Sequence, residues 1–75
     1  MNDKTRKLLK SAVETIEILH SSISTIRDEE QDKYDNLPEG LQQSENGQKF
    51  EETLDTLGEA LSNLEEAISY IDSVI

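Results

Sequence analysis

Residues 50–75 read FEETLDTLGEALSNLEEAISYIDSVI, and this stretch decides the fold. Large apolar side chains recur in it at alternating steps of four and three, at Phe50, Leu54, Leu57, Leu61, Leu64, Ile68, Ile71 and Ile75. This spacing places them on one stripe of an α-helix, and such a stripe is stable only when another helix covers it. Ala60, Ala67 and Val74 widen the stripe into a face that can contact two neighbouring helices. The stretch therefore predicts one helix of a bundle.

A second apolar stripe lies in the first half of the chain. Its members are also three and four residues apart, and they are Leu9, Ala12, Ile16, Leu19, Ile23 and Ile26. Two matched stripes predict an antiparallel two-helix hairpin, an all-α fold in a single domain. We expect helix 1 over about 3–35, a loop over 36–43 and helix 2 over about 44–74, with Asn2 or Asp3 and then Ser44 as the N-caps.

The chain is short for a fold that stands alone, because a domain of about 60 residues buries only about 60% of the surface that its unfolded chain exposes. It has no cysteine for a disulfide and one histidine, His20, too few for a zinc site; we expect no metal or other cofactor. Two helices, each about 45 Å long, would also leave much of both apolar faces wet. We therefore expect a homodimeric four-helix bundle, with a higher oligomer or a heteromeric partner helix as the alternative.

The predicted oligomer interface consists of the large apolar residues of the two stripes. They are Leu9, Ile16, Leu19, Ile23, Ile26, Phe50, Leu54, Leu57, Leu61, Leu64, Ile68 and Ile71.

The net charge is −10, although residues 1–10 hold four bases against one acid. A field of this sign repels phosphate backbones and anionic lipid, so direct binding to nucleic acid or membrane is not expected. It favours a partner protein with a basic surface; the alternative is that the acids only keep a small bundle soluble. The first ten residues lack the apolar core of a signal peptide and no run approaches the length of a membrane span, so we expect the cytoplasm.

Residues 28–35 hold five acids and no aliphatic side chain, and the break that follows contains Pro38 and Gly40. Here an acidic helix end adjoins a long loop with apolar anchors, which is typical of binding loops. The candidate partner-binding residues are Asp28, Glu29, Glu30, Asp32, Tyr34, Asp35, Leu37 and Leu41. Alternatively, the apolar residues among them only close the bundle end. The spacing of the acids does not match a calcium loop, and nothing marks a catalytic pocket, so no enzyme is expected.

Four local features yield further expectations. His20 follows Leu19 and is expected to be half-buried beside the seam. Gly58 inside helix 2 suggests a close approach between the helices, and Pro38 is suited to start one short helical turn. In an antiparallel hairpin the four bases of residues 1–10 would lie beside Asp72 and the terminal carboxylate, which would favour this arrangement.

Residues 29–47, EEQDKYDNLPEGLQQSENG, are followed by acidic Leu/Ala heptads. Together they resemble small acidic helical proteins of Gram-positive bacteria and their phages. The resemblance implies a phage or prophage accessory protein of unassigned activity. By analogy, small acidic phage proteins of other families inhibit host nucleases or defence proteins by occupying a basic surface. We therefore hypothesise a non-enzymatic protein-binding module, a phage-encoded inhibitor of a host defence or nucleic-acid-handling protein. The alternative is a structural or assembly module that acts through self-association or within a larger complex.

Overall fold

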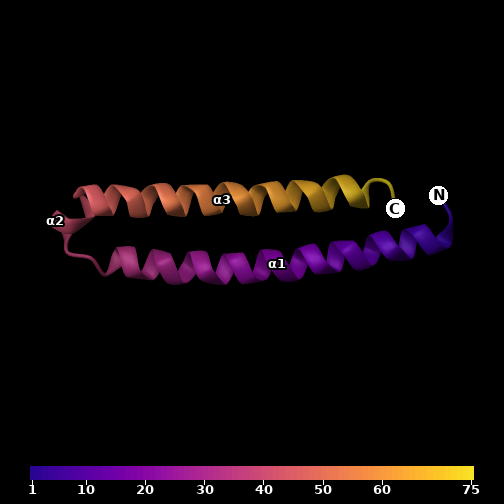
Figure 1. Cartoon of the computed structure of the whole chain (residues 1–75), viewed down its shortest axis with the longest axis horizontal. Helices are drawn as coiled ribbons and strands as arrows, with labels where there is room; N and C mark the ends of the chain where they lie inside the picture. Colours follow the sequence, from indigo (N-terminus) through magenta and orange to yellow (C-terminus); the bar gives the residue numbers. More distant parts are fainter.

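The computed structural model describes residues 1–75 and shows an antiparallel helical hairpin (Figure 1). Helix α1 spans Asp3–Asp35, α2 spans Glu39–Gln42 and α3 spans Glu45–Asp72. The chain is 87% helical and contains no strand. Both termini lie at one end of the long hairpin, and α2 lies at the other (Figure 1). The predicted all-α hairpin is confirmed, including a first helix over residues 3–35.

Both long helices begin at predicted N-caps. Asn2 Oδ1 accepts a hydrogen bond from the Thr5 N–H at 2.8 Å, and Ser44 Oγ accepts one from the Gly47 N–H at 3.3 Å. Each side chain satisfies a backbone donor that has no partner within the first helical turn. α1 ends before Pro38, whose ring prevents the chain from continuing as a helix.

The connection between the long helices is a compact elbow rather than an extended loop. The predicted single turn after Pro38 is present as α2. The Gln42 side-chain amide donates to the Tyr34 carbonyl at 3.0 Å and to the Leu37 carbonyl at 3.2 Å, which fixes α2 against the end of α1. Gly47 is buried at the start of α3, and a Cβ there would lie 2.1 Å from the Gln42 carbonyl oxygen. The elbow therefore depends on a glycine at this position.

The seam between the long helices uses only part of the stripe expected on helix 1. The part that lies in the seam, where each side chain is half-buried, is Leu9, Ile16 and Ile23. The exposed part is Ala12, Leu19 and Ile26. Its places in the seam are taken by the residues one position later, Val13, His20 and Arg27. The apolar stripe of α1 is too broad for one neighbouring helix to cover, so the structure leaves one edge of it in water.

The stripe of α3 lies as predicted, with every member from Phe50 to Ile75 buried or half-buried. The core is nevertheless thin, because Val13 and Leu54 are its only buried apolar side chains and neither is completely buried. The chain exposes 5592 Å², whereas a compact protein of the same mass would expose about 4,650 Å². Its radius of gyration is 17.2 Å, against about 11 Å for a compact domain. One hairpin by itself therefore leaves much of its apolar surface in contact with water.

Candidate protein-binding surfaces

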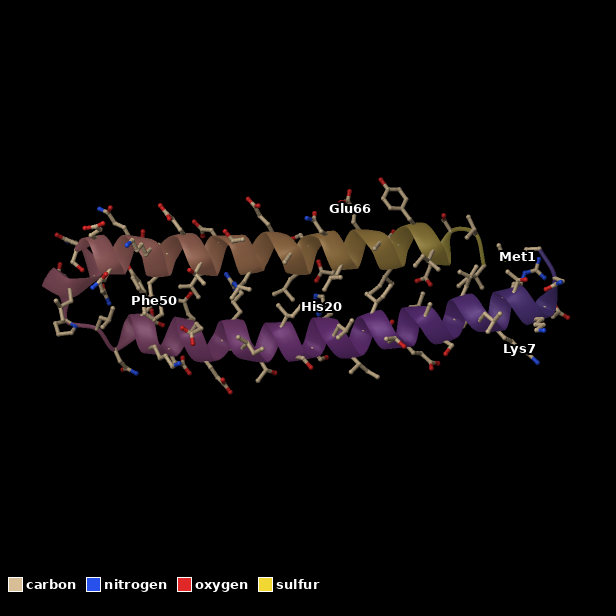
Figure 2. The ribbon with its side chains drawn as sticks, viewed as in Figure 1. Met1, Lys7, His20, Phe50 and Glu66 are labelled. Carbon is tan, nitrogen blue, oxygen red and sulfur yellow. The ribbon has the colours of Figure 1, made fainter.

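Three contacts spaced one heptad apart cross one side of the hairpin. The pairs are His20 with Glu65, Arg27 with Gly58, and Tyr34 with Glu51. Each step of seven residues along α1 is matched by a step of seven back along α3, so these contacts fix the register of the antiparallel pair. We call this side the polar flank. His20 points between the two helices (Figure 2), half-buried as predicted, and its Nε2 lies 3.0 Å from Glu65 Oε1.

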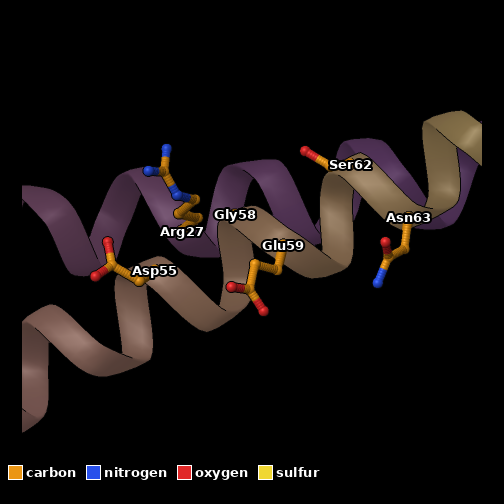
Figure 3. Close-up of a pocket in the computed structure, with 6 residues that line it drawn as sticks. All are labelled: Arg27, Asp55, Gly58, Glu59, Ser62 and Asn63. Atoms are coloured by element: carbon orange, nitrogen blue, oxygen red, sulfur yellow. The ribbon is translucent and has the colours of Figure 1, made fainter.

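The middle contact explains the glycine inside α3. Arg27 Nε donates to the Leu54 carbonyl at 3.3 Å and would lie 3.6 Å from a Cβ at position 58 (Figure 3). A helical side chain covers the turn that precedes it, so a larger side chain at position 58 would lie over this carbonyl, and Gly58 leaves it open to Arg27. The close approach of the two helices expected at Gly58 is not found, because the nearest atoms to a Cβ there belong to the Arg27 side chain and lie at ordinary contact distance. Sequence reasoning did not place Arg27 in the seam, although its seven-residue spacing from His20 and Tyr34 is a usable signal.

A shallow polar hollow surrounds this contact, and its other walls are Asp55, Glu59, Ser62 and Asn63 on α3 (Figure 3). No apolar side chain lines it. Arg27 uses its Nε–H for the Leu54 carbonyl, so the hollow offers a ligand the two carboxylates and the terminal nitrogens of the guanidinium. Elsewhere in the chain, no three potential metal ligands come together.

The acidic end of α1 presents most of the predicted binding residues to solvent. The exposed acids are Asp28, Glu29, Asp32 and Asp35. Glu30 is half-buried and accepts a hydrogen bond from Lys33 Nζ at 2.8 Å. This bond and the negative charge of Glu30 raise the pKa of Lys33 above its ordinary value. Four of the five predicted acids therefore stand free of any basic side chain.

The three apolar members of the predicted site are placed differently from one another. Tyr34 is half-buried, and its ring centroid lies 6.2 Å from that of Phe50. Its hydroxyl donates to Glu51, and this bond, followed by partial burial, raises the pKa of Tyr34 above its ordinary value. Leu37 is half-buried at the elbow, whereas Leu41 is 53% exposed. Tyr34 and Leu37 thus help to close the hairpin end, and Leu41 is the apolar side chain that a partner can reach.

The four bases near the N-terminus lie at the same end of the hairpin as Asp72 (Figure 1). The predicted pairing with Asp72 or the terminal carboxylate does not form, because the one ion pair in this region joins Arg6 to Asp3 at 3.3 Å. Lys7 points away from α3 (Figure 2). Lys4, Lys7 and Lys10 therefore remain available to another molecule.

Fold and surfaces define the class of this protein: an elongated, acidic helical hairpin with open surfaces and a thin core. Neither long helix has an apolar segment of the length needed to cross a bilayer. Comparisons of the chain with protein-family models, with curated proteins and with solved structures found no match. The function is therefore inferred from the geometry and charge of the hairpin.

Proposed function

We propose that the chain is a non-enzymatic protein-binding module that docks onto the basic surface of another protein. The observation that carries this proposal is the state of its acids. Four of the seventeen acidic side chains lie within 4.0 Å of a basic group, which leaves thirteen unpaired. Unpaired carboxylates of one sign repel each other, and a basic partner relieves that repulsion while being attracted from a distance.

The strongest part of this field lies at the elbow end. Asp28, Glu29, Asp32 and Asp35 occupy the last turns of α1, and Glu39 of α2 follows them. Leu41 of α2 adds an exposed apolar side chain at the same end of the hairpin. We propose that this end meets the partner first, since exposed acids and a reachable leucine at one end provide both attraction and a contact that excludes water.

We propose further that the working form is a homodimeric four-helix bundle. The two buried apolar side chains of one hairpin are a small core for 75 residues, and a second hairpin would cover the half-exposed sides of both stripes.

Residues 29–47, which resemble small acidic helical proteins of Gram-positive bacteria and their phages, support a proposed phage or prophage origin. With this origin we propose the role of an inhibitor of a host defence or nucleic-acid-handling protein in the host cytoplasm.

The test is a pull-down from host lysate at low and at high salt. A basic protein retained only at low salt is the expected result, because salt screens attraction between exposed charges. Reversal of Asp28, Glu29, Asp32 and Asp35 to lysine should abolish its capture. The matched control reverses four exposed acids of α3 instead, Glu52, Asp55, Glu59 and Glu66, and should retain most binding. Equal loss in both variants would contradict a site at the elbow end, and capture insensitive to salt would contradict acidic docking.

A second function, an assembly module that joins a larger complex through apolar contact, is favoured by the exposed leucine and isoleucine side chains of α1. Leu8, Leu19 and Ile26 are all more than half exposed. This function predicts binding that persists or strengthens at high salt, and it predicts that the charge reversals have little effect.

A further inference from the structure

The side of the hairpin opposite the polar flank carries two rows of small and large apolar residues. Each residue of these rows directly precedes a seam residue in the sequence. The row on α1 consists of Ala12, Leu19 and Ile26. The row on α3 consists of Ala60 and Ala67, and Val74 continues it just beyond the helix end. Within each row the step is seven residues, so each row runs straight along its helix. Leu19 is 52%, Ile26 51% and Val74 56% exposed. We call these two rows the acid-free flank.

The two rows lie on the same side of the hairpin. In an antiparallel pair, equivalent heptad positions of the two helices come to the same side of the seam. The contacts of the polar flank show this directly: Glu17 and Glu65, each of which follows a seam residue, line one hollow together with His20. The residues that precede seam positions, such as Leu19 and Ala67, therefore share the opposite side.

The acid-free flank is distinguished by its charge. Between residues 8 and 26 of α1, the row of the acid-free flank contains no charged side chain. The neighbouring row on α1 contains none either, since it consists of Leu8, Thr15 and Ser22. On α3 the neighbouring positions are Thr53, Thr56, Asn63 and Tyr70, and Lys49 at the elbow end is the one charge. The acids of α3 lie on the polar flank and on the back of the helix. In a chain with seventeen acids, this is the lengthwise strip along which two copies can touch without opposing carboxylates.

We propose that the acid-free flank binds a second copy of the same chain, with the two elbows at opposite ends of the bundle. This inference rests on the dimer proposed above and specifies its surface and orientation. The uncharged strip from residue 8 to residue 26 of α1 is about 27 Å long, and the hairpin is 15 Å across. Two copies would thus cover roughly 800 Å² in total, which lies below the range for stable specific interfaces and is typical of a weak dimer. A basic partner, by contrast, has no carboxylate to meet on this strip.

The orientation follows from the ends. Residues 28–35 of α1 carry five acids and one base, and residues 1–10 carry four bases and one acid. With the elbows at opposite ends, the acidic end of each copy lies at the same end of the bundle as the basic first ten residues of the other, where Lys4, Lys7 and Lys10 are exposed and form no ion pair within their own chain. With the elbows together, two acidic ends would repel each other. The attraction is modest because these groups are exposed, but it selects one of two arrangements that bury the same apolar rows.

Cysteine cross-linking tests the surface. The chain has no cysteine of its own, so Ala67→Cys introduces a single thiol. The register of the polar flank puts residue 67 level with residue 18, near the middle of both rows, where the twofold axis would pass. Mild oxidation should yield a covalent dimer of this variant. Ser69→Cys, two positions away on the exposed back of α3, is the control and should remain monomeric on a denaturing gel.

Spin labels at Gly40→Cys test the orientation, because a Cβ at this elbow position has nothing within 4 Å. The twofold axis lies level with residue 18, and residue 37 marks the elbow end. If the elbows lie at opposite ends, the two labels are roughly 57 Å apart, which is twice the helical rise from residue 18 to residue 37. Elbows at the same end would place them within roughly 25 Å. The shorter distance would overturn the proposed orientation.

A pair of neighbouring substitutions tests the contact itself. Leu19→Glu should raise the dimer dissociation constant by roughly a hundredfold or more, because the contact would bury an unpaired charge. Ile18→Glu is its control, since Ile18 is exposed to a similar degree but lies outside the acid-free flank. A wild-type chain that sediments as a monomer would overturn the dimer. A dimer that cross-links through Ser69→Cys and not through Ala67→Cys would overturn only the surface proposed here, and the pull-down would still test basic-partner docking.

Discussion

The Tyr34 hydroxyl of α1 donates a hydrogen bond to the Glu51 carboxylate of α3 and so joins the two long helices at the elbow end. The bond needs a protonated tyrosine, and it holds the pKa of Tyr34 above the ordinary value of 10.0. A group whose pKa is higher in the folded state stabilises the fold fully below its unfolded pKa and loses this contribution as pH rises through the folded pKa. The contact should therefore support the hairpin at neutral pH and fail in alkali.

We expect the Tyr34→Phe variant to melt below the wild type at neutral pH, with the difference vanishing at strongly alkaline pH. Ultraviolet titration of the tyrosines, with Tyr34→Phe subtracted, should give a pKa for Tyr34 that falls when Glu51 becomes glutamine. An unchanged titration in Glu51→Gln would show that the bond does not persist in solution. Thr53→Ser, on the other side of α3, serves as a control for the melting measurements.

Gly47→Ala should destabilise the protein strongly. The new methyl group would lie 2.1 Å from a backbone oxygen of Gln42, so α2 and the start of α3 would have to separate. A loss of about 2 kcal/mol or more is expected for such overpacking, and this lowers the melting temperature by roughly 8–16 °C. Gly40→Ala is the matched control, because nothing lies near its Cβ and alanine favours helix. Circular dichroism of the two variants at equal concentration makes the measurement, and similar melting would contradict the packing at Gly47.

Gly58→Ala should be tolerated and should raise the free energy of unfolding by up to about 1 kcal/mol. Its Cβ would meet Arg27 Nε at 3.6 Å, an ordinary contact distance. Gly58→Leu should instead displace Arg27 from the Leu54 carbonyl and lower stability. Combined with Arg27→Ala, the leucine substitution should lose most of its cost, and a double-mutant cycle measures this coupling. Additive effects would indicate that Arg27 does not occupy the space beside Gly58.

The melting temperature should rise with protein concentration if two hairpins share their apolar faces, because association stabilises the folded form by mass action. Calorimetry over a ~100-fold range of concentration makes the measurement. Leu19→Glu should flatten the dependence, whereas Ile18→Glu should preserve it. A wild-type melting temperature that does not change with concentration would support a monomer.

The candidate site was predictable in part. Four of the five acids of residues 28–35 are exposed, and the sequence contains the reason, since no aliphatic side chain interrupts them. The hydrogen bond from Tyr34 to Glu51 was not predictable from the sequence. It depends on the register between the two long helices, which the shape of the elbow sets. The same holds for Lys4, Lys7 and Lys10, which the sequence predicted beside Asp72 and which form no ion pair with it.

The sequence by itself determined where the helices begin and end, because caps, proline and apolar spacing act over a few residues. Asn2, Ser44 and Pro38 act in this way. The apolar spacing from Phe50 to Ile75 fits only one face of a helix. The tertiary structure alone decided which edge of the α1 stripe enters the seam. Leu19 and His20 are adjacent, and both fit a helical period that includes Ile16 and Ile23. Only the register against α3, with Glu65 beside His20, selects His20 for the seam and leaves Leu19 in water.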